Sequence, residues 1–207
     1  MAFFWILGMA DTVYLTYHHY RVNILMPAGS SFCAVNEVID CDKAATSFGS
    51  MFMGFPVATW GMFAFLFLVF FMAVERLLYW EIQKALYGFL LFILYTMALF
   101  SIVEAFISFF ILNVVCIMCV FLYIIIILMV VACKRALAVS HLEFLILLRD
   151  LFFSSLFRTL LRKGTSVAII ALVFSGLIAI GLDGKFRETF YYQRVDIMLS
   201  EPRPEGD

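Results

Sequence analysis

The sequence has few charged residues and little of the polar surface that a water-soluble protein needs. Charged residues make up 14% of the 207 residues and hydrophobic residues 65%, whereas a soluble domain carries roughly 25% charged and about 45–50% apolar residues. With 25 Phe and a mean hydropathy of +1.06, a globule of this size would expose apolar patches that aggregate. A soluble globular protein is therefore excluded, and the solvent of this chain is lipid.

The sequence shows neither a basic surface nor an internal repeat, and its first apolar run is not expected to be a signal peptide. Its 14 Lys and Arg are balanced by 15 Asp and Glu and stand in ones and twos, which argues against nucleic acid as a partner. No basic segment precedes the first apolar run and no small-residue cleavage site follows it, so the run does not fit a signal peptide. The repeated halves that many transporters show are missing as well.

Uncharged apolar runs predict five membrane-crossing helices, since one span needs about 20 apolar residues. The uncharged stretch from Ala105 to Cys133 is too long for one span, so we divide it near residues 108–113. The first run is short and contains Asp11, but it continues through His18 and His19, which we place at the membrane interface. The expected spans are residues 3–17, 51–74, 85–107, 113–133 and 165–182, the last ended by a polar segment that starts at Asp183.

Basic residues in short loops predict the orientation, because cytoplasmic loops are rich in Lys and Arg. The loop 21–50, the turn near Asn113 and the C-terminal tail then share the outer side, together with four of the five cysteines. Cys133 alone lies on the inner side. The residues that define the cytoplasmic side are Arg76, Lys84, Lys134, Arg135, Arg158, Arg162 and Lys163.

The stretch between the fourth and fifth spans, residues 136–163, mixes apolar and charged residues. We interpret it as an interfacial amphipathic helix or helix pair. A sixth span is the alternative, but it would place Arg149 and Asp150 at its middle, where charges are costly.

Cys116 and Cys119 form a Cys-x-x-Cys motif at the start of the predicted fourth span. The helix dipole and unpaired backbone N–H groups stabilise a thiolate at this place, and Asn113 is a suitable cap, so we expect a lowered pKa for Cys116. The three-residue spacing brings both sulfurs onto one helical turn. The pattern therefore predicts a reversible disulfide, with mere packing of the two cysteines as the alternative.

Cys33 and Cys41 lie in the polar outer loop. Thiol–disulfide exchange can pass electrons from this pair to the membrane pair, each step being the attack of a thiolate on a disulfide sulfur. In an apolar bundle the natural terminal acceptor is a lipid-soluble quinone. A structural disulfide is the alternative for the loop pair, and a four-sulfur zinc site is disfavoured because the two pairs differ in spacing and setting. Cys133 is expected to pack in the core.

These features together resemble the vitamin K epoxide reductase family, in particular its bacterial members. The resemblance covers about residues 5–133. It is carried by the loop pair Cys33 and Cys41, by Ser47 six residues later, by Gly54-Phe55-Pro56 at the opening of the second span, by Cys116-Ile-Met-Cys119 at the opening of the fourth, and by Tyr-Leu-Thr-Tyr at 14–17.

The resemblance implies a four-helix bundle for the first part of the chain, and the apolar and charged runs divide the rest into segments. We expect an all-α integral membrane protein, with a four-helix bundle around a quinone site and a fifth transmembrane helix. The segments would be the bundle, 1–135, with its outer loop, 21–50; a cytoplasmic interfacial segment, 136–164; a fifth span, 165–183; and a polar outer-side tail or linker, 184–207.

The resemblance also implies the site residues. Cys33 and Cys41 would be the catalytic shuttle pair, Cys116 would exchange with one of them, and Cys119 would face the quinone, ubiquinone or menaquinone. Tyr123 is expected near the quinone, or else as an ordinary aromatic wall residue. Ser47 is expected to hydrogen-bond around the quinone site, and no metal is expected.

Location and partner follow from the same resemblance. The protein would be a multi-pass protein of the bacterial inner membrane with its active cysteines facing the periplasm. The sequence differs from some family members at two points: no amide side chain occurs in the second span, where Thr59 and Trp60 stand instead, and the given sequence does not continue into the thioredoxin-like domain of many bacterial members. Either the chain was shortened at a linker, or a separate periplasmic thioredoxin-fold (DsbA-like) protein delivers the electrons.

The expected function is therefore a quinone-dependent thiol–disulfide oxidoreductase that supports disulfide formation. Two alternatives stay open: an enzyme that reduces a quinone or its epoxide for the sake of that product, and a transporter or scaffold with structural cysteines. Asp11 and Glu104 are candidates for protonating the reduced quinone, because intramembrane carboxylates are functional hypotheses by default. Placement near an interface is the alternative for both.

Overall fold

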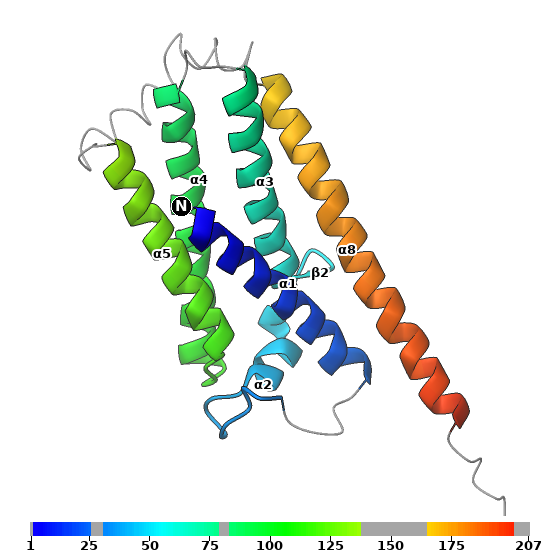
Figure 1. Cartoon of the computed structure of the whole chain (residues 1–207). Helices are drawn as coiled ribbons and strands as arrows, with labels where there is room; N and C mark the ends of the chain where they lie inside the picture. Colours follow the sequence, from blue (N-terminus) through cyan, green and yellow to red (C-terminus); the bar gives the residue numbers. More distant parts are fainter. Residues whose placement is uncertain (1, 26–30, 79–82, 138–164, 201–207) are drawn as a thin grey trace, which may run out of the picture.

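Long helices dominate the fold. The computed structural model describes residues 2–25, 31–78, 83–137 and 165–200. Its long helices are α1 (Ala2–Leu25), α3 (Val57–Leu78), α4 (Gln83–Phe106), α5 (Ile117–Leu137) and α8 (Thr165–Ser200). Figure 1 shows α1 lying obliquely across the bundle and α8 running along it, and α1 contacts α3, α5 and α8. The expected all-α membrane class is confirmed.

Three helices of the described part are long and apolar enough to cross a membrane. They comprise Phe89–Ile111, Ile117–Arg135 and Ile169–Ser200, while Val57–Ala73 is a shorter apolar helix. The chain is therefore a membrane protein. The predicted interfacial segment 136–163 lies almost wholly outside the described residues.

The core lies between α3, α4 and α5, where aromatic and aliphatic side chains are fully enclosed. Phe65, Leu91 and Ile125 represent the three helices in this buried cluster, and Cys133 packs into it with no exposed surface. A side chain on Gly8 of α1 would come within 2.4 Å of the Phe65 ring. Gly8 therefore allows α1 to approach α3 closely, as small residues do between membrane helices.

A short hairpin precedes α3 and makes that helix begin later than the sequence predicts. β1 (Met51–Phe52) pairs antiparallel with β2 (Phe55–Pro56). Met53 and Gly54 connect them with positive φ angles of 52° and 85°, the left-handed pair that a tight two-residue hairpin turn requires. The predicted span 51–74 is thus a hairpin followed by a helix from Val57. Pro56 directly precedes that helix, where its fixed φ costs no intrahelical hydrogen bond.

α8 continues well beyond the polar segment that was expected to end it. Asp183 is buried in the middle of this helix, and its carboxylate accepts hydrogen bonds from the hydroxyls of Tyr20 (2.8 Å) and Thr59 (2.7 Å). Because α1 and α3 supply these donors, Asp183 needs no water, and the helix runs on to Ser200. The predicted tail from residue 184 is therefore helical as far as residue 200.

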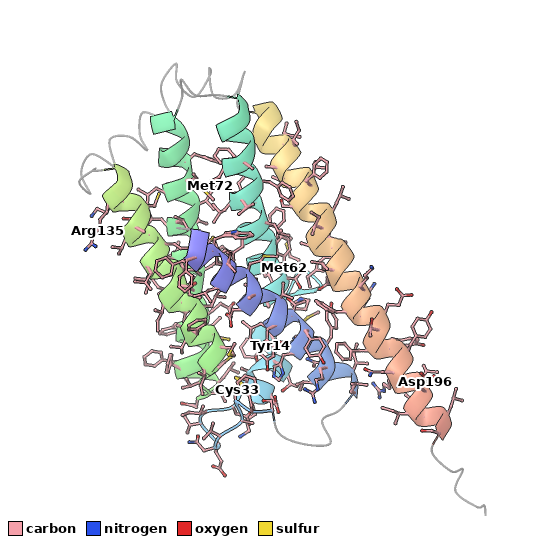
Figure 2. All side chains as sticks on the ribbon, in the orientation of Figure 1. Tyr14, Cys33, Met62, Met72, Arg135 and Asp196 are labelled. Carbon is pink, nitrogen blue, oxygen red and sulfur yellow. A yellow bond between two sulfur atoms is a disulfide. The ribbon has the colours of Figure 1, made fainter. Side chains whose placement is uncertain are left out.

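The two ends of the bundle differ in structure. α2 (Cys41–Thr46), the 3₁₀ turn η1 (Phe48–Ser50) and the hairpin gather at one end. Figure 2 shows Cys33 at that end and Arg135 toward the opposite one, with Asp196 of α8 on the Cys33 side. This arrangement agrees with the predicted separation of the loop cysteines from the basic end of the fourth span.

Candidate functional site

The outer loop is closed by a disulfide between Cys33 and Cys41, whose Cα atoms lie 5.7 Å apart. Cys41 is the first residue of α2 because Asp40 caps that helix, accepting hydrogen bonds from the backbone N–H groups of Asp42 (2.9 Å) and Lys43 (3.0 Å). A capping carboxylate satisfies N–H groups that would otherwise be unpaired. The cap thus fixes the position of Cys41 at the start of α2.

Backbone hydrogen bonds hold this loop against the segment that leads into α5. Ile39 and Val115 form a parallel bridge, in which Asp40 N–H donates to the Val115 carbonyl (3.1 Å) and Val115 N–H donates to the Val38 carbonyl (2.6 Å). The bridge lies two residues before Cys41 and one before Cys116. It therefore brings the loop pair to the membrane pair.

The two cysteine pairs meet in one buried cluster. Cys33, Cys41 and Cys116 are almost fully enclosed, and Cys119 is packed against them together with Leu15 and other apolar side chains. Cys116 and Cys119 are free thiols while the loop pair is oxidised. An oxidised pair next to a reduced pair is the arrangement that thiol–disulfide exchange requires.

Cys116 itself caps α5, which corrects the expectation that Asn113 does so. Its sulfur accepts a hydrogen bond from Cys119 N–H (3.3 Å), while Asn113 has a φ of 52° and forms part of the turn before the helix. A hydrogen bond from the Cys119 side chain lowers the pKa of the Cys116 thiol. Backbone N–H groups of Cys119 and Met118 act in the same direction, and together they outweigh burial, which raises it. The lowered pKa of Cys116 thus has causes other than an Asn113 cap: the Cys119 thiol first, and then the backbone N–H groups that the sulfur itself caps.

The turn before Cys116 contains a helical irregularity. The last turns of the α4 helix widen into the π-helix η3 (Ile107–Ile111), and Ser108 donates its hydroxyl to the Val114 carbonyl (2.5 Å). This segment coincides with the predicted break at 108–113. π-Bulges are frequent at functional sites, and this one positions the chain that carries Cys116.

A cavity of about 490 Å³ opens beside the cysteine cluster, between the loop end and helices α3, α4 and α5. Its wall is mainly apolar, and pockets of about 300–1,000 Å³ with a few polar groups are typical of small-molecule sites. The polar or reactive side chains on the wall include Ser47, Trp60, Glu104, Cys116, Cys119 and Tyr123. The size and the apolar wall suit a quinone headgroup, with a sulfur on the wall beside it.

Asp42 connects the outer loop to α1 and to Ser31. Its carboxylate accepts a hydrogen bond from Ser31 N–H (3.1 Å) and lies 3.0 Å from Nε2 of His18, although these two atoms are not aligned as a hydrogen bond. Burial by itself would raise the pKa of Asp42, but the hydrogen bonds from Ser31 and the charge of His18 bring it below its usual value. The anion is therefore the form that holds the loop closed.

The decisive comparison is with protein families: a family model described as the vitamin K epoxide reductase family matches residues 1–133. The chain belongs to this family. The match covers both cysteine pairs and ends within α5, before α8. No curated protein and no solved structure gives a significant match. Membership of the vitamin K epoxide reductase family makes the chain a membrane oxidoreductase of the quinone-linked kind.

Ser47 and Tyr123, expected at the quinone site by resemblance to the vitamin K epoxide reductase family, both line the cavity. Ser47 donates its hydroxyl to the Ala44 carbonyl (2.8 Å). His18 and His19, expected at the membrane interface, are buried and also line the cavity. The folded loop covers them, which a sequence pattern cannot indicate.

The second span has no amide side chain, and the structure shows where Thr59 and Trp60 lie. Thr59 is turned toward Asp183, whereas Trp60 lines the cavity and donates its indole N–H to the Phe52 carbonyl (3.0 Å). The α3 side of the cavity combines aromatic side chains with small ones. Sequence reasoning named Trp60 as a departure but did not assign it to the site.

The Asp42 contacts predict an acid-sensitive loop in this vitamin K epoxide reductase family member. Because the folded-state pKa is depressed, the stabilisation is complete above the unfolded pKa of about 3.9 and is lost as the pH falls through the lower folded value. Reduction of the Cys33–Cys41 disulfide by a phosphine should therefore accelerate below about pH 4. Asp42→Asn should be reduced about tenfold faster at neutral pH and lack the acid-dependent rise, since hydrogen bonds to a charged group contribute roughly 1.5–3 kcal/mol.

Glu37→Gln is the matched control for this prediction, because Glu37 is an exposed carboxylate of the same loop. Its reduction rates should follow the wild type at every pH. Equal rates for Asp42→Asn and the wild type across the pH range would show that Asp42 does not hold the loop.

Proposed function

We propose that the protein transfers electrons from a thiol substrate through Cys33 and Cys41 to Cys116 and Cys119 and then to a quinone, and so supports disulfide bond formation. The observation that carries this proposal is the buried cluster of both cysteine pairs on the edge of the cavity. Because the two cysteine pairs are in contact, electrons can pass between them by direct thiol–disulfide exchange, without a diffusing carrier. The apolar cavity beside them is accessible to a lipid-soluble acceptor.

The order of exchange is supported by which sulfurs reach the cavity. Cys41, Cys116 and Cys119 all line it, whereas Cys33 does not. We therefore assign Cys41 as the loop residue that exchanges with Cys116, and Cys33 as the residue that the outside thiol attacks. In each exchange one S–S bond breaks while another forms, and the thiolate released carries the electron pair onward.

Cys119 and Tyr123 define the proposed quinone side of the cavity. They lie one helical turn apart on α5, so both side chains face the same wall. Ubiquinone or menaquinone, when bound there, would take up two electrons and two protons. Tyr123 offers a hydroxyl toward this space, and Ser47 lines it from the loop end.

The proposed location is a bacterial inner membrane, with the loop end facing the periplasm. Thiol oxidation needs an oxidising compartment, and the basic residues Lys134 and Arg135 in the last turn of α5 favour the cytoplasm for the other end. The proposed electron donor is a thioredoxin-fold protein of the periplasm. Such a donor has to reach a disulfide that is almost fully enclosed, so the loop has to open for the exchange.

Quinone reduction by the purified wild type in detergent tests this function. A reduced thioredoxin-fold protein supplies the electrons, and the absorbance of the quinone reports turnover. The expected result is catalytic reduction, retained by Cys133→Ala because this thiol is buried in the core away from the cavity. No turnover by a wild type with intact thiols, with either ubiquinone or menaquinone analogues, would reject the proposal.

A further inference from the structure

The wall of the cavity contains a carboxyl group that electron transfer between sulfurs does not use. Glu104 lies on α4 within the apolar span Phe89–Ile111 and lines the same cavity as Cys119 and Tyr123. Among the described residues it is the sole carboxylate on that wall. Charged side chains are rare inside membranes because burying them there is costly.

The position of Glu104 follows the helical repeat of α4. Met97, Phe100, Ser101 and Ser108 line the cavity with it, at the three- and four-residue spacing of one helix face. Glu104 is therefore turned inward with this face. No ion pair joins Glu104 to a basic residue of the described chain. A structural salt bridge therefore does not explain why a carboxyl group stands at this position.

Asp11, the other carboxyl group considered for proton transfer, does not line the cavity. Asp11 of α1 is buried and both of its carboxylate oxygens lack a hydrogen-bond partner among the described residues. A group that exchanges a proton with a ligand has to come within hydrogen-bond reach of it, and of these two carboxyl groups Glu104 lies on the wall that a ligand in the cavity would contact.

We propose that Glu104 is the proton-transfer residue of the quinone site, a role that rests on the function proposed above. When Cys116 and Cys119 close to a disulfide, two S–H bonds break, one S–S bond forms and two electrons leave the sulfurs. A bound quinone receives both electrons and forms two O–H bonds, so the thiol protons balance the reaction. The Glu104 carboxyl gives a proton to the ligand oxygen and takes a replacement that originates from the thiols, one at a time.

The cavity gives a physical reason for such a relay. A mainly apolar wall offers few groups that can carry a proton between sulfur and oxygen, and general acid–base catalysis by a placed side chain contributes about 10²–10⁴-fold. The lining hydroxyl of Ser101 already donates to the Met97 carbonyl (3.0 Å). His18 and His19 line the cavity from α1, but His18 lies 3.0 Å from Asp42 and His19 lies 3.4 Å from Asn23. On the α4 and α5 side, where Cys119 lies, Glu104 is a group that can alternate between two protonation states.

Glu104→Gln tests the proposal, because glutamine keeps the size and polarity of the side chain but cannot carry the proton. We expect kcat for quinone reduction to fall by about 10²-fold or more with an enlarged solvent deuterium isotope effect. Glu104→Asp should recover part of the rate, since it keeps the carboxyl group. Glu188→Gln, the same substitution at an exposed residue of α8 outside the cavity wall, is the matched control and should stay within about threefold of the wild type.

Two readouts do not depend on turnover. Quenching of tryptophan fluorescence by the quinone should give the same affinity, within about threefold, for Glu104→Gln and the wild type. The infrared carbonyl band of protonated carboxyl groups should be weaker in quinone-free Glu104→Gln than in the quinone-free wild type, and the part that remains should disappear when Asp11 is replaced by asparagine as well. A band of unchanged intensity in Glu104→Gln, or an unchanged kcat at unchanged affinity, would overturn the assignment of Glu104.

The outcomes separate this inference from the proposed function. A wild type that reduces quinone, next to an unimpaired Glu104→Gln, overturns the inference alone. A wild type that reduces no quinone overturns both. If both Glu104→Gln and Glu104→Asp lose quinone affinity together with kcat, Glu104 serves in quinone binding and the proton-transfer role is wrong.

Discussion

Cys119→Ala and Cys116→Ala are each expected to lower quinone reduction by about 10³-fold or more, whichever thiol supplies the electrons. Each sulfur is a covalent participant, and removal of a residue that forms the reaction's bonds eliminates that route rather than weakening it. The measurement is quinone turnover with two donors in parallel: a reduced thioredoxin-fold protein and a small dithiol. Both variants should fail with both donors.

The loop pair provides the control for this prediction. Cys33→Ser combined with Cys41→Ser should abolish turnover driven by the thioredoxin-fold protein but retain turnover driven by a small dithiol, which can reach Cys116 directly once the loop disulfide is gone. Substantial activity of Cys119→Ala with either donor would remove the Cys-x-x-Cys motif from the mechanism. The oxidoreductase would then have to use another electron path.

The second large effect is expected in a disulfide-trapping experiment that distinguishes Cys41 from Cys33 as the partner of Cys116. With Cys33 and Cys119 both replaced by serine, Cys41 and Cys116 are left as the facing thiols of the cluster, and oxidation should join them in nearly every molecule. With Cys41 and Cys119 replaced instead, we expect little cross-linking between Cys33 and Cys116, because Cys33 does not line the cavity that Cys41 and Cys116 share. Mass spectrometry of peptides under non-reducing conditions identifies the bond.

Both outcomes of the trapping experiment are informative about geometry. Serine is close in size to cysteine, so neither double variant should disturb the packing of the cluster. Equal trapping of Cys33 and Cys41 would show that the loop turns freely over Cys116. It would contradict the ordered exchange that the bridge between Ile39 and Val115 favours.

The meeting of the two cysteine pairs could be predicted from the sequence because few residues with rigid spacing are involved. Cys116 and Cys119 stand at a helix start, where a thiol of a Cys-x-x-Cys motif is expected to have a lowered pKa. The loop pair could be connected with it because few cysteines occur and hydrophobic runs fix the sides of the membrane. The all-α class followed from composition alone.

Other parts of the site depend on contacts between distant segments. Asn113 has the residue type of a helix cap, but the bridge between Ile39 and Val115 places Cys116 at the capping position instead. Likewise Trp60 reached the cavity because the hairpin 51–56 delays the start of α3. A local pattern contains no information on such pairings.

Asp183 shows the same limit for helix ends. From the sequence alone, Asp183 is predicted to end the fifth span, because an unpaired carboxylate in lipid is costly. Tyr20 and Thr59, far away along the chain, supply the hydroxyls that satisfy it. The boundary could be recognised only once the partners were known.

The Asp183 contacts also bear on biosynthesis. Residues 1–133, which correspond to the family, are made first, and until α8 is inserted the hydroxyls of Tyr20 and Thr59 lack the acceptor that they bind in the finished fold. α8 contacts both α1 and α3, with Phe190 packed against Tyr17 at ring centroids 5.0 Å apart. Maturation of the catalytic bundle is thus tied to the last helix, and the ribosome has to pass Asp183 before the enzyme can reach its final packing.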